Sequence, residues 1–195
     1  GEFYHVYNRG NRGEFIFFEE SDRIRFLFLI LYLQLPLFPS NTDYHEKLYK
    51  KHGVFYLQTK RRSIQAALSK RSIALVSFTL MPDHFHLIIQ AKKDDGISTY
   101  MQRVQNAYTK YFNIKQGKKG HLFEGPYHLV HVESNEQLLN LSAYVHRNIR
   151  EIREWRNKES MYPYSSLFDY VRENRFGELL QRGVVLDQFK SSDDY

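Results

Sequence analysis

The pattern of hydrophobic and polar residues predicts a chain in which short strands and amphipathic helices follow one another. Alternating or continuous apolar runs predict strands over 3–8, 73–80, 84–90 and 127–132. Helical spacing of apolar residues predicts three helices, which end near residues 33, 114 and 156. We expect Ser21 or Asp22 to cap the first helix, Ser98 the second, and Ser134, in a capping box with Gln137, the third.

This order of elements predicts the fold class. Strand, helix, two strands, helix and strand, followed by a further helix, is the plan of a ferredoxin-like split βαβ sandwich. We therefore predict an α+β fold with a four-stranded antiparallel sheet and helices. One domain is expected over residues 1–172, with a basic inserted helix–loop segment at about 36–72 that either faces nucleic acid or is a solvated excursion. A C-terminal helical tail is expected over 173–195.

Composition narrows the classes of function. The chain has 195 residues, 28 Lys and Arg against 22 Asp and Glu, and a net charge of +6, which is compatible with a polyanionic partner. The 15 Tyr and 15 Phe suit stacking with unpaired bases, although an aromatic core explains most of them. Because Cys is absent, any metal ion must be held by His, carboxylate or amide groups. The mean hydropathy of -0.57, the short apolar runs and the lack of a visible secretory signal favour a cytoplasmic protein without a membrane span.

Two histidines lie inside a strand that otherwise has the pattern of a buried one. His84 and His86 share one face of the strand predicted at 84–90, while Phe85, Leu87 and Ile89 face the core. Paired imidazoles are suitable ligands for a divalent metal ion. A hydrogen-bonded structural pair is an equally good interpretation of these two residues alone.

The last predicted helix carries a second pair of chemically suggestive residues. Tyr144 and Asn148 are four positions apart and therefore project from one face of this helix. They lie beside its predicted core stripe, which consists of Leu138, Leu141, Val145, Ile149 and Ile152. An asparagine carbonyl can be an oxygen ligand of a hard cation, and a tyrosine can attack a phosphodiester as a nucleophile. Taken alone, Tyr144 also fits a tyrosine at the edge of the core, and Asn148 a solvated residue or a local cap. Tyr108 and Tyr111 are rival nucleophiles.

Five motifs follow one another along the chain. They are YHVYNRG (4–10), LMPDHFHL (80–87), GHLFEG (120–125), YVHRN (144–148) and YPYSS (162–166). In this order they resemble the motifs of the IS200-like, Y1-type transposases, and most closely those of the REP-associated tyrosine transposases. The resemblance extends to about Tyr170. The insertion after Leu33 is longer than the family leads us to expect, and the tail after Arg172 is unmatched.

The resemblance implies an HUH-class nuclease and strand transferase that acts on single-stranded DNA next to hairpins through a 5′-phosphotyrosine intermediate. By position, His84 and His86 match the family's histidine pair, Tyr144 its nucleophile and Asn148 its third metal ligand. The implied cofactor is Mg²⁺ or Mn²⁺, and the implied partner is single-stranded DNA with a hairpin. The family includes monomers and homodimers, so both states remain open.

Three positions depart from the family's pattern. Asp83 stands where Asn is usual, Ile149 where Pro often follows the ligand Asn, and Pro126 where Arg is common. Because none of these changes removes a catalytic group, they bear on substrate preference rather than on chemistry.

Further basic residues are candidates for contact with phosphate groups. They are Arg9, Arg12, Arg103 and Lys110, each of which also fits a solvated surface. The alternative function is a non-catalytic single-stranded nucleic-acid-binding module on a ferredoxin-like sheet. A third interpretation is a metal-dependent hydrolase that uses water.

Overall fold

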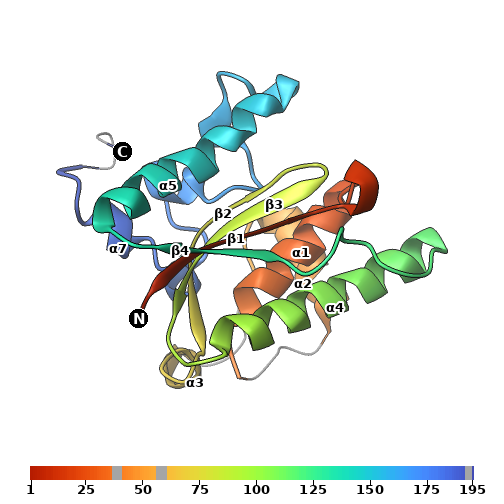
Figure 1. Ribbon diagram of the computed structural model, residues 1–195, viewed down its shortest axis with the longest axis horizontal. Coiled ribbons are helices and arrows are strands. Elements are labelled where there is room, and N and C mark those ends of the chain that lie inside the picture. Colours follow the sequence, from red (N-terminus) through yellow and green to blue (C-terminus); the bar gives the residue numbers. More distant parts are fainter. Residues whose placement is uncertain (37–40, 56–60, 192–194) are drawn as a thin grey trace.

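A four-stranded antiparallel sheet forms the centre of the protein (Figure 1). The computed structural model describes residues 1–36, 41–55, 61–191 and 195, with the backbone alone for 61–64. The strands are β1 (Phe3–Arg9), β2 (Ile73–Leu80), β3 (His84–Ala91) and β4 (His128–Val132). Their order in the sheet is β2-β3-β1-β4, and all neighbours are antiparallel. The predicted α+β class and four-stranded sheet are confirmed.

Helices α1 (Glu20–Tyr32) and α4 (Gly96–Gln116) cover one face of this sheet (Figure 1). Helix α1 is buried on nearly all sides from Phe26 onward, because α2 (Thr42–His52) packs on it from outside. His45 and Tyr49 of α2 are buried, so this part of the inserted segment belongs to the core. The segment continues through α3 (Arg61–Leu68) to β2.

Helix α5 (Asn135–Arg147) lies over the opposite face. Its buried Leu138 and Val145 belong to a second apolar cluster with Val76 of β2 and Ile88 of β3. Strands β2 and β3 are thus covered on both faces, which explains why β2 is a continuous buried run rather than an alternating one.

The predicted helix boundaries need three corrections. Helix α1 is capped by Glu19, and Asp22 reaches back from the third helical position instead of capping the helix itself. Helix α4 begins at Gly96 after an Asp95 cap, before the expected Ser98. The Ser134 cap is confirmed, since its side chain accepts a hydrogen bond from the backbone N–H of Gln137.

The third correction concerns the end of α5, which stops at Arg147 and not near residue 156. Short 3₁₀ turns follow, at Asn148–Glu151, Arg153–Trp155 and Glu159–Met161. The physical reason is that Val145 packs in the cluster under α5, whereas Ile149 is buried in the main core with Ile152 and Trp155 against it. A straight helix would keep these side chains on one stripe, so the chain bends.

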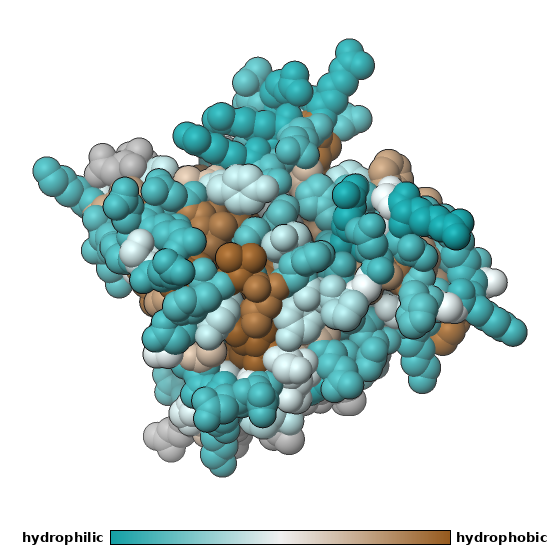
Figure 2. Space-filling model, in the orientation of Figure 1, coloured by the Kyte–Doolittle hydropathy of each residue, from teal (hydrophilic) through white to brown (hydrophobic). Residues whose placement is uncertain are grey.

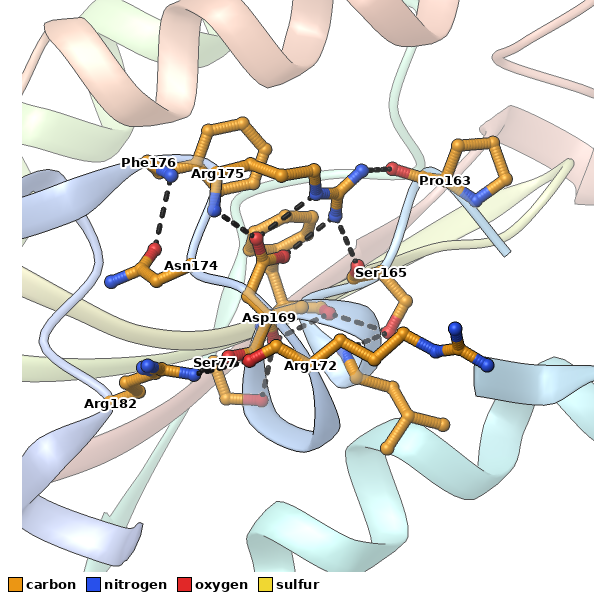
Figure 3. A network of polar contacts seen from close by, with 12 residues as sticks. Ser77, Pro163, Ser165, Asp169, Arg172, Asn174, Arg175, Phe176 and Arg182 are labelled. Atoms are coloured by element: carbon orange, nitrogen blue, oxygen red, sulfur yellow. Dashed lines mark hydrogen bonds and ion pairs between the residues drawn. The ribbon is translucent and has the colours of Figure 1, made fainter. Parts of the chain in front are cut away.

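The C-terminal segment covers the edge of the sheet at β2. It contains α6 (Leu167–Val171), a 3₁₀ turn at Gly177–Leu179 and α7 (Gly183–Leu186). The N–H of Leu80 donates to the carbonyl of Tyr164, and the N–H of Gln181 donates to the carbonyl of Leu75. A network around a buried Asp169 holds this segment (Figure 3).

The other edge of the sheet, β4, is uncovered. Figure 2 shows an apolar area in the middle of an otherwise largely hydrophilic face. It lies over β4, where Leu129 and Val130 are 46% and 45% exposed. In the part of the chain that is described, no helix combines the length and hydropathy needed to cross a bilayer.

Candidate active site

The two predicted histidines occupy the face of the sheet on which α5 packs. Their ring centroids are 5.1 Å apart, and the ring planes are nearly perpendicular, at 86°. His86 is buried, and the side chain of His84 is 22% exposed. Phe85, Leu87 and Ile89 are fully buried in the main core on the other face. The alternation predicted from the sequence is therefore present.

Each of these histidines is held by its Nδ1 atom. Nδ1 of His84 lies 2.6 Å from Oδ1 of Asp83, and Nδ1 of His86 lies 2.9 Å from Nε2 of His5. Among the contacts of the described residues, neither Nε2 atom of the pair has a hydrogen-bond partner. Histidines that bind metals through Nε2 typically donate the Nδ1 proton to a second group, as the carboxylate of Asp83 would accept it. The donor atoms of the pair therefore fit a divalent cation.

His5 is a residue of this site that the sequence did not single out. Its ring stacks on that of His86, with centroids 5.1 Å apart. Burial lowers the pKa of His5 to about 4. Burial, with smaller contributions from His5 and His84, lowers the pKa of His86 to about 3. Both rings are thus neutral at physiological pH, as a metal ligand and its hydrogen-bond partner must be. The available signal was the alternation of 3–8, but only the pairing of β1 with β3 brings His5 to His86.

The phenol of Tyr144 stands beside these imidazoles in the same chain. Its ring centroid is 5.7 Å from that of His86 and 6.2 Å from that of His5, and both contacts are edge-on. Tyr144 is 52% exposed, so a ligand can reach the ring. A hollow of about 300 Å³ opens next to it between α5 and β4.

Asn148 follows Tyr144 by one turn, at the C-terminal cap of α5. It is buried, and its amide nitrogen donates to the carbonyl of Tyr144 over 2.8 Å. This bond fixes the amide at the helix end, and in the described chain its oxygen has no hydrogen-bond partner. No group of three His, Cys, Asp or Glu residues suited to a metal ion occurs among the described residues. A third ligand from this chain would therefore be an amide oxygen such as that of Asn148.

The rival tyrosines lie on the other side of the sheet. The hydroxyl of Tyr108 is buried and donates to the carbonyl of Ile16 over 2.6 Å, and burial raises its pKa. The hydroxyl of Tyr111 donates to Oδ1 of Asp22 over 3.0 Å. Both phenols have structural partners away from the histidine pair.

The predicted phosphate contacts are spread over the molecule. Arg9 is the cross-strand neighbour of His84 and forms ion pairs with Asp83, at 3.7 Å, and Glu124, at 3.9 Å. Arg12 lies in the exposed 3₁₀ turn Asn11–Gly13, and Lys110 is exposed on α4. Arg103, also on α4, donates to the carbonyl of Leu33 over 3.1 Å and so has a structural partner. Only Arg9 is next to the histidines.

The structure combines a ferredoxin-like sheet, two histidines on one of its faces and a tyrosine on the helix that packs there. These are the features that the resemblance to the IS200-like transposases implies. The family model "Transposase IS200 like" matches residues 42–148, which is more than half of the chain. The protein therefore belongs to the IS200-like transposase family, whose activity is DNA transposition.

Comparison with solved structures supports the fold. One match is described as "Structure of the REP associates tyrosine transposase bound to a REP hairpin". It has a TM-score of 0.52 and 15% sequence identity, and the match covers 90% of this chain and 81% of that chain. No curated protein matches the sequence.

Proposed function

We propose that this transposase cleaves and rejoins single-stranded DNA next to a hairpin, with Tyr144 as the nucleophile. The observation that carries the proposal is the approach of the Tyr144 ring to within 5.7 Å of His86 in one chain, between centroids. This approach supports an active site built within a single subunit. Membership of the family supports transposition, and the hairpin in the solved neighbour suggests the form of the substrate.

The residues present fit a divalent cation, Mg²⁺ or Mn²⁺. Nε2 of His84, Nε2 of His86 and the amide oxygen of Asn148 would hold it. When bound, the cation would neutralise charge on the scissile phosphate and orient the leaving oxygen. Asp83 and His5 would keep the two imidazoles in the orientation and tautomer that this requires.

The chemical step is a transesterification. The Tyr144 hydroxyl oxygen forms a bond to phosphorus and loses its proton to solvent, and the bond from phosphorus to the 3′ oxygen breaks. The leaving oxygen takes up a proton and becomes a free 3′-hydroxyl, while the 5′ phosphate remains on Tyr144. Attack by another 3′-hydroxyl reverses these changes and rejoins strands without an external energy source. The exposed position of Tyr144 beside the hollow at β4 allows the strand to enter.

Four basic residues would contact the DNA backbone. Arg9 borders His84 directly, and Arg12 and Lys110 are exposed in the turn after β1 and on α4. Arg103 would contribute through its remaining guanidinium donors, since one of them binds Leu33. The net charge of +6 favours such contacts, which weaken as salt concentration rises.

The test is a covalent adduct on a denaturing gel. Wild-type protein is mixed with a labelled hairpin that carries unpaired flanks, with Mg²⁺ or with a chelator. We expect an adduct only with the metal ion, and its loss in Tyr144→Phe with hairpin binding retained. Tyr108→Phe and Tyr111→Phe are matched controls that should keep the adduct.

Other results would identify the alternatives. An adduct that persists in Tyr144→Phe would move the nucleophile elsewhere. Cleavage without an adduct would indicate a hydrolase that uses water. Binding without cleavage or metal dependence would indicate a non-catalytic nucleic-acid-binding module.

A further inference from the structure

We propose that a cavity between α4 and the loop before β4 binds an unpaired nucleobase of the DNA strand that flanks the hairpin. The inference rests on the proposed function for the presence of that strand, but the site is separate from the histidines. The cavity has a volume of about 770 Å³, within the usual range for sites that enclose small ligands.

One wall of the cavity is a polar face of α4. Gln105, Asn106, Thr109, Lys110 and Asn113 recur at helical spacing along this wall. Apart from Lys110, these side chains are uncharged groups that can donate and accept hydrogen bonds. Amide side chains offer a donor and an acceptor side by side, which matches the edge of a base.

The opposite wall supplies an apolar surface and a negative charge. Leu122 and Phe123 are largely buried but contribute to the lining, so a flat ring would find apolar contact there. The carboxylate of Glu124 also lines the cavity. It disfavours a phosphate in the interior but can accept a hydrogen bond from the amino group of a base. Lys110 is the cation of the lining and suits the phosphate that follows the base.

Gln105 supplies an independent sign of a missing ligand. Its amide nitrogen is shielded from solvent and has no hydrogen-bond partner. An unsatisfied buried donor is unfavourable, and native proteins leave few of them. Because the terminal torsion of Gln is soft, rotation of the amide can turn this donor toward the cavity that the residue lines. A base carbonyl or ring nitrogen would then satisfy it.

Backbone contacts connect the loop that lines the cavity to the strands of the candidate active site. Phe123 forms a bridge with Gly10, and the N–H of Glu124 donates to the carbonyl of Arg9. Arg9 in turn pairs with His84 across β1 and β3. The backbone of Phe123 is therefore two strand spacings from that of His84, or about 10 Å. A single strand that crosses this end of the sheet can reach both sites with nucleotides close to the scissile bond.

The experiment compares Gln105→Ala with Gln102→Ala, a matched control on the exposed side of α4 and outside the cavity. Both changes are made in the Tyr144→Phe background, and binding is measured by fluorescence anisotropy. The DNAs are a hairpin with unpaired flanks and the same hairpin without them. We expect Gln105→Ala to weaken binding of the flanked hairpin about tenfold, the effect of losing one recognised base, and to leave the bare hairpin unchanged. Gln102→Ala should change neither.

Abasic substitutions along the flank identify the base. At one position, loss of the base should weaken binding by the Tyr144→Phe protein about tenfold and have no further effect once Gln105→Ala is added, because both changes remove the same contact. Additive effects at every position would overturn the proposal. So would a Gln105→Ala variant that binds both DNAs as tightly as the Tyr144→Phe protein, or one that loses affinity for both DNAs equally. Since the amide nitrogen of Gln105 makes no hydrogen bond, the thermal unfolding midpoint of the Gln105→Ala variant should not fall.

The covalent assay separates this inference from the proposed function. If protein with an intact Tyr144 forms the adduct but Gln105→Ala does not weaken binding of the flanked hairpin, only the proposed base-binding cavity is rejected. A Gln105 effect without any adduct would reject the tyrosine chemistry alone.

Discussion

At the scale of single residues, the ring nitrogens of three histidines decide what the sheet face can bind. If Nε2 of His86 holds a cation, its proton must be on Nδ1, which then donates to Nε2 of His5. His5 therefore acts as a positioning residue, and its own proton lies on Nδ1. The carboxylate of Asp83 plays the corresponding part for His84. The unusual Asp at this position thus has a structural role beside the histidine.

This arrangement predicts the effect of replacing His5. We expect His5→Ala to weaken Mn²⁺ binding about 10- to 100-fold, because His86 loses the group that orients it. His5→Gln should recover part of the affinity, since its amide oxygen can accept the same proton. Isothermal titration calorimetry with Mn²⁺ measures both, and hairpin binding without metal should not change.

His131→Ala is the control, because His131 lies on β4 and contacts Tyr4 and Glu2 instead. An unaltered Mn²⁺ affinity in His5→Ala would show that His86 needs no partner, or is no ligand.

At the scale of elements, a buried carboxylate ties the start of α1 to the end of α4. Asp22 accepts hydrogen bonds from the backbone N–H groups of Phe18 and Glu19, from Lys115 at 2.6 Å and from Tyr111 at 3.0 Å. Burial by itself would raise the pKa of Asp22, but these hydrogen bonds, above all that from Lys115, hold it below its usual value. The ionised form is therefore the one that the fold stabilises.

We predict that Asp22→Asn lowers the free energy of unfolding at pH 7 by about 2–4 kcal/mol, because Lys115 loses its buried partner. A lowered pKa contributes stability that is present above the unfolded value, near pH 4, and is lost as the pH falls through the folded value. The difference between wild type and variant should therefore shrink below about pH 4. Urea unfolding across this range measures it.

Asp94→Asn is the control, because Asp94 is exposed, and its free energy of unfolding should stay within about 0.5 kcal/mol of that of wild type. A constant Asp22→Asn difference down to pH 2 would contradict the assignment.

At the scale of the whole molecule, the C-terminal segment is fixed by one buried ion pair. Asp169 is fully buried and accepts from Nε and Nη2 of Arg175, at 3.0 and 2.6 Å (Figure 3). The same guanidinium donates to the carbonyls of Pro163 and Ser165. Arg182 donates to the Asp169 carbonyl. These bonds connect α6, the turns after it and the stretch that covers β2.

We predict that Arg175→Met lowers the free energy of unfolding by about 3–5 kcal/mol, because the carboxylate of Asp169 remains buried without its partner. Arg172→Met is the matched control, since Arg172 is exposed. It should change the free energy of unfolding by less than about 0.5 kcal/mol. Urea unfolding followed by circular dichroism provides the comparison. Equal stability of the two variants would mean that the pair contributes nothing net.

Local patterns were sufficient for the strands and for the face of each side chain on them. The alternation in β3 separates His84 and His86 from the core residues between them, and the four strands lie within a residue or two of their predicted positions. The end of α5 could not be foreseen, because the bend at Asn148 is caused by the burial of Ile149 and Ile152 in a different cluster from Val145. A helical tail was expected over 173–195, but the positions of its short turns, Gly177–Leu179 and Gly183–Leu186, could not be predicted, since a turn of four residues has no periodicity to detect.

What the sequence determined by itself is the set of elements, the family's motifs and the residue types that carry chemistry, because each depends on spacing along one segment. What only the tertiary structure decided is which segments meet. The order β2-β3-β1-β4 brings His5 to His86, and the packing of α5 on that face brings Tyr144 beside them. The cavity between α4 and the loop at Phe123 likewise exists only once distant segments pack. Contacts of this kind depend on the burial of apolar surface by the whole chain, and no local pattern encodes them.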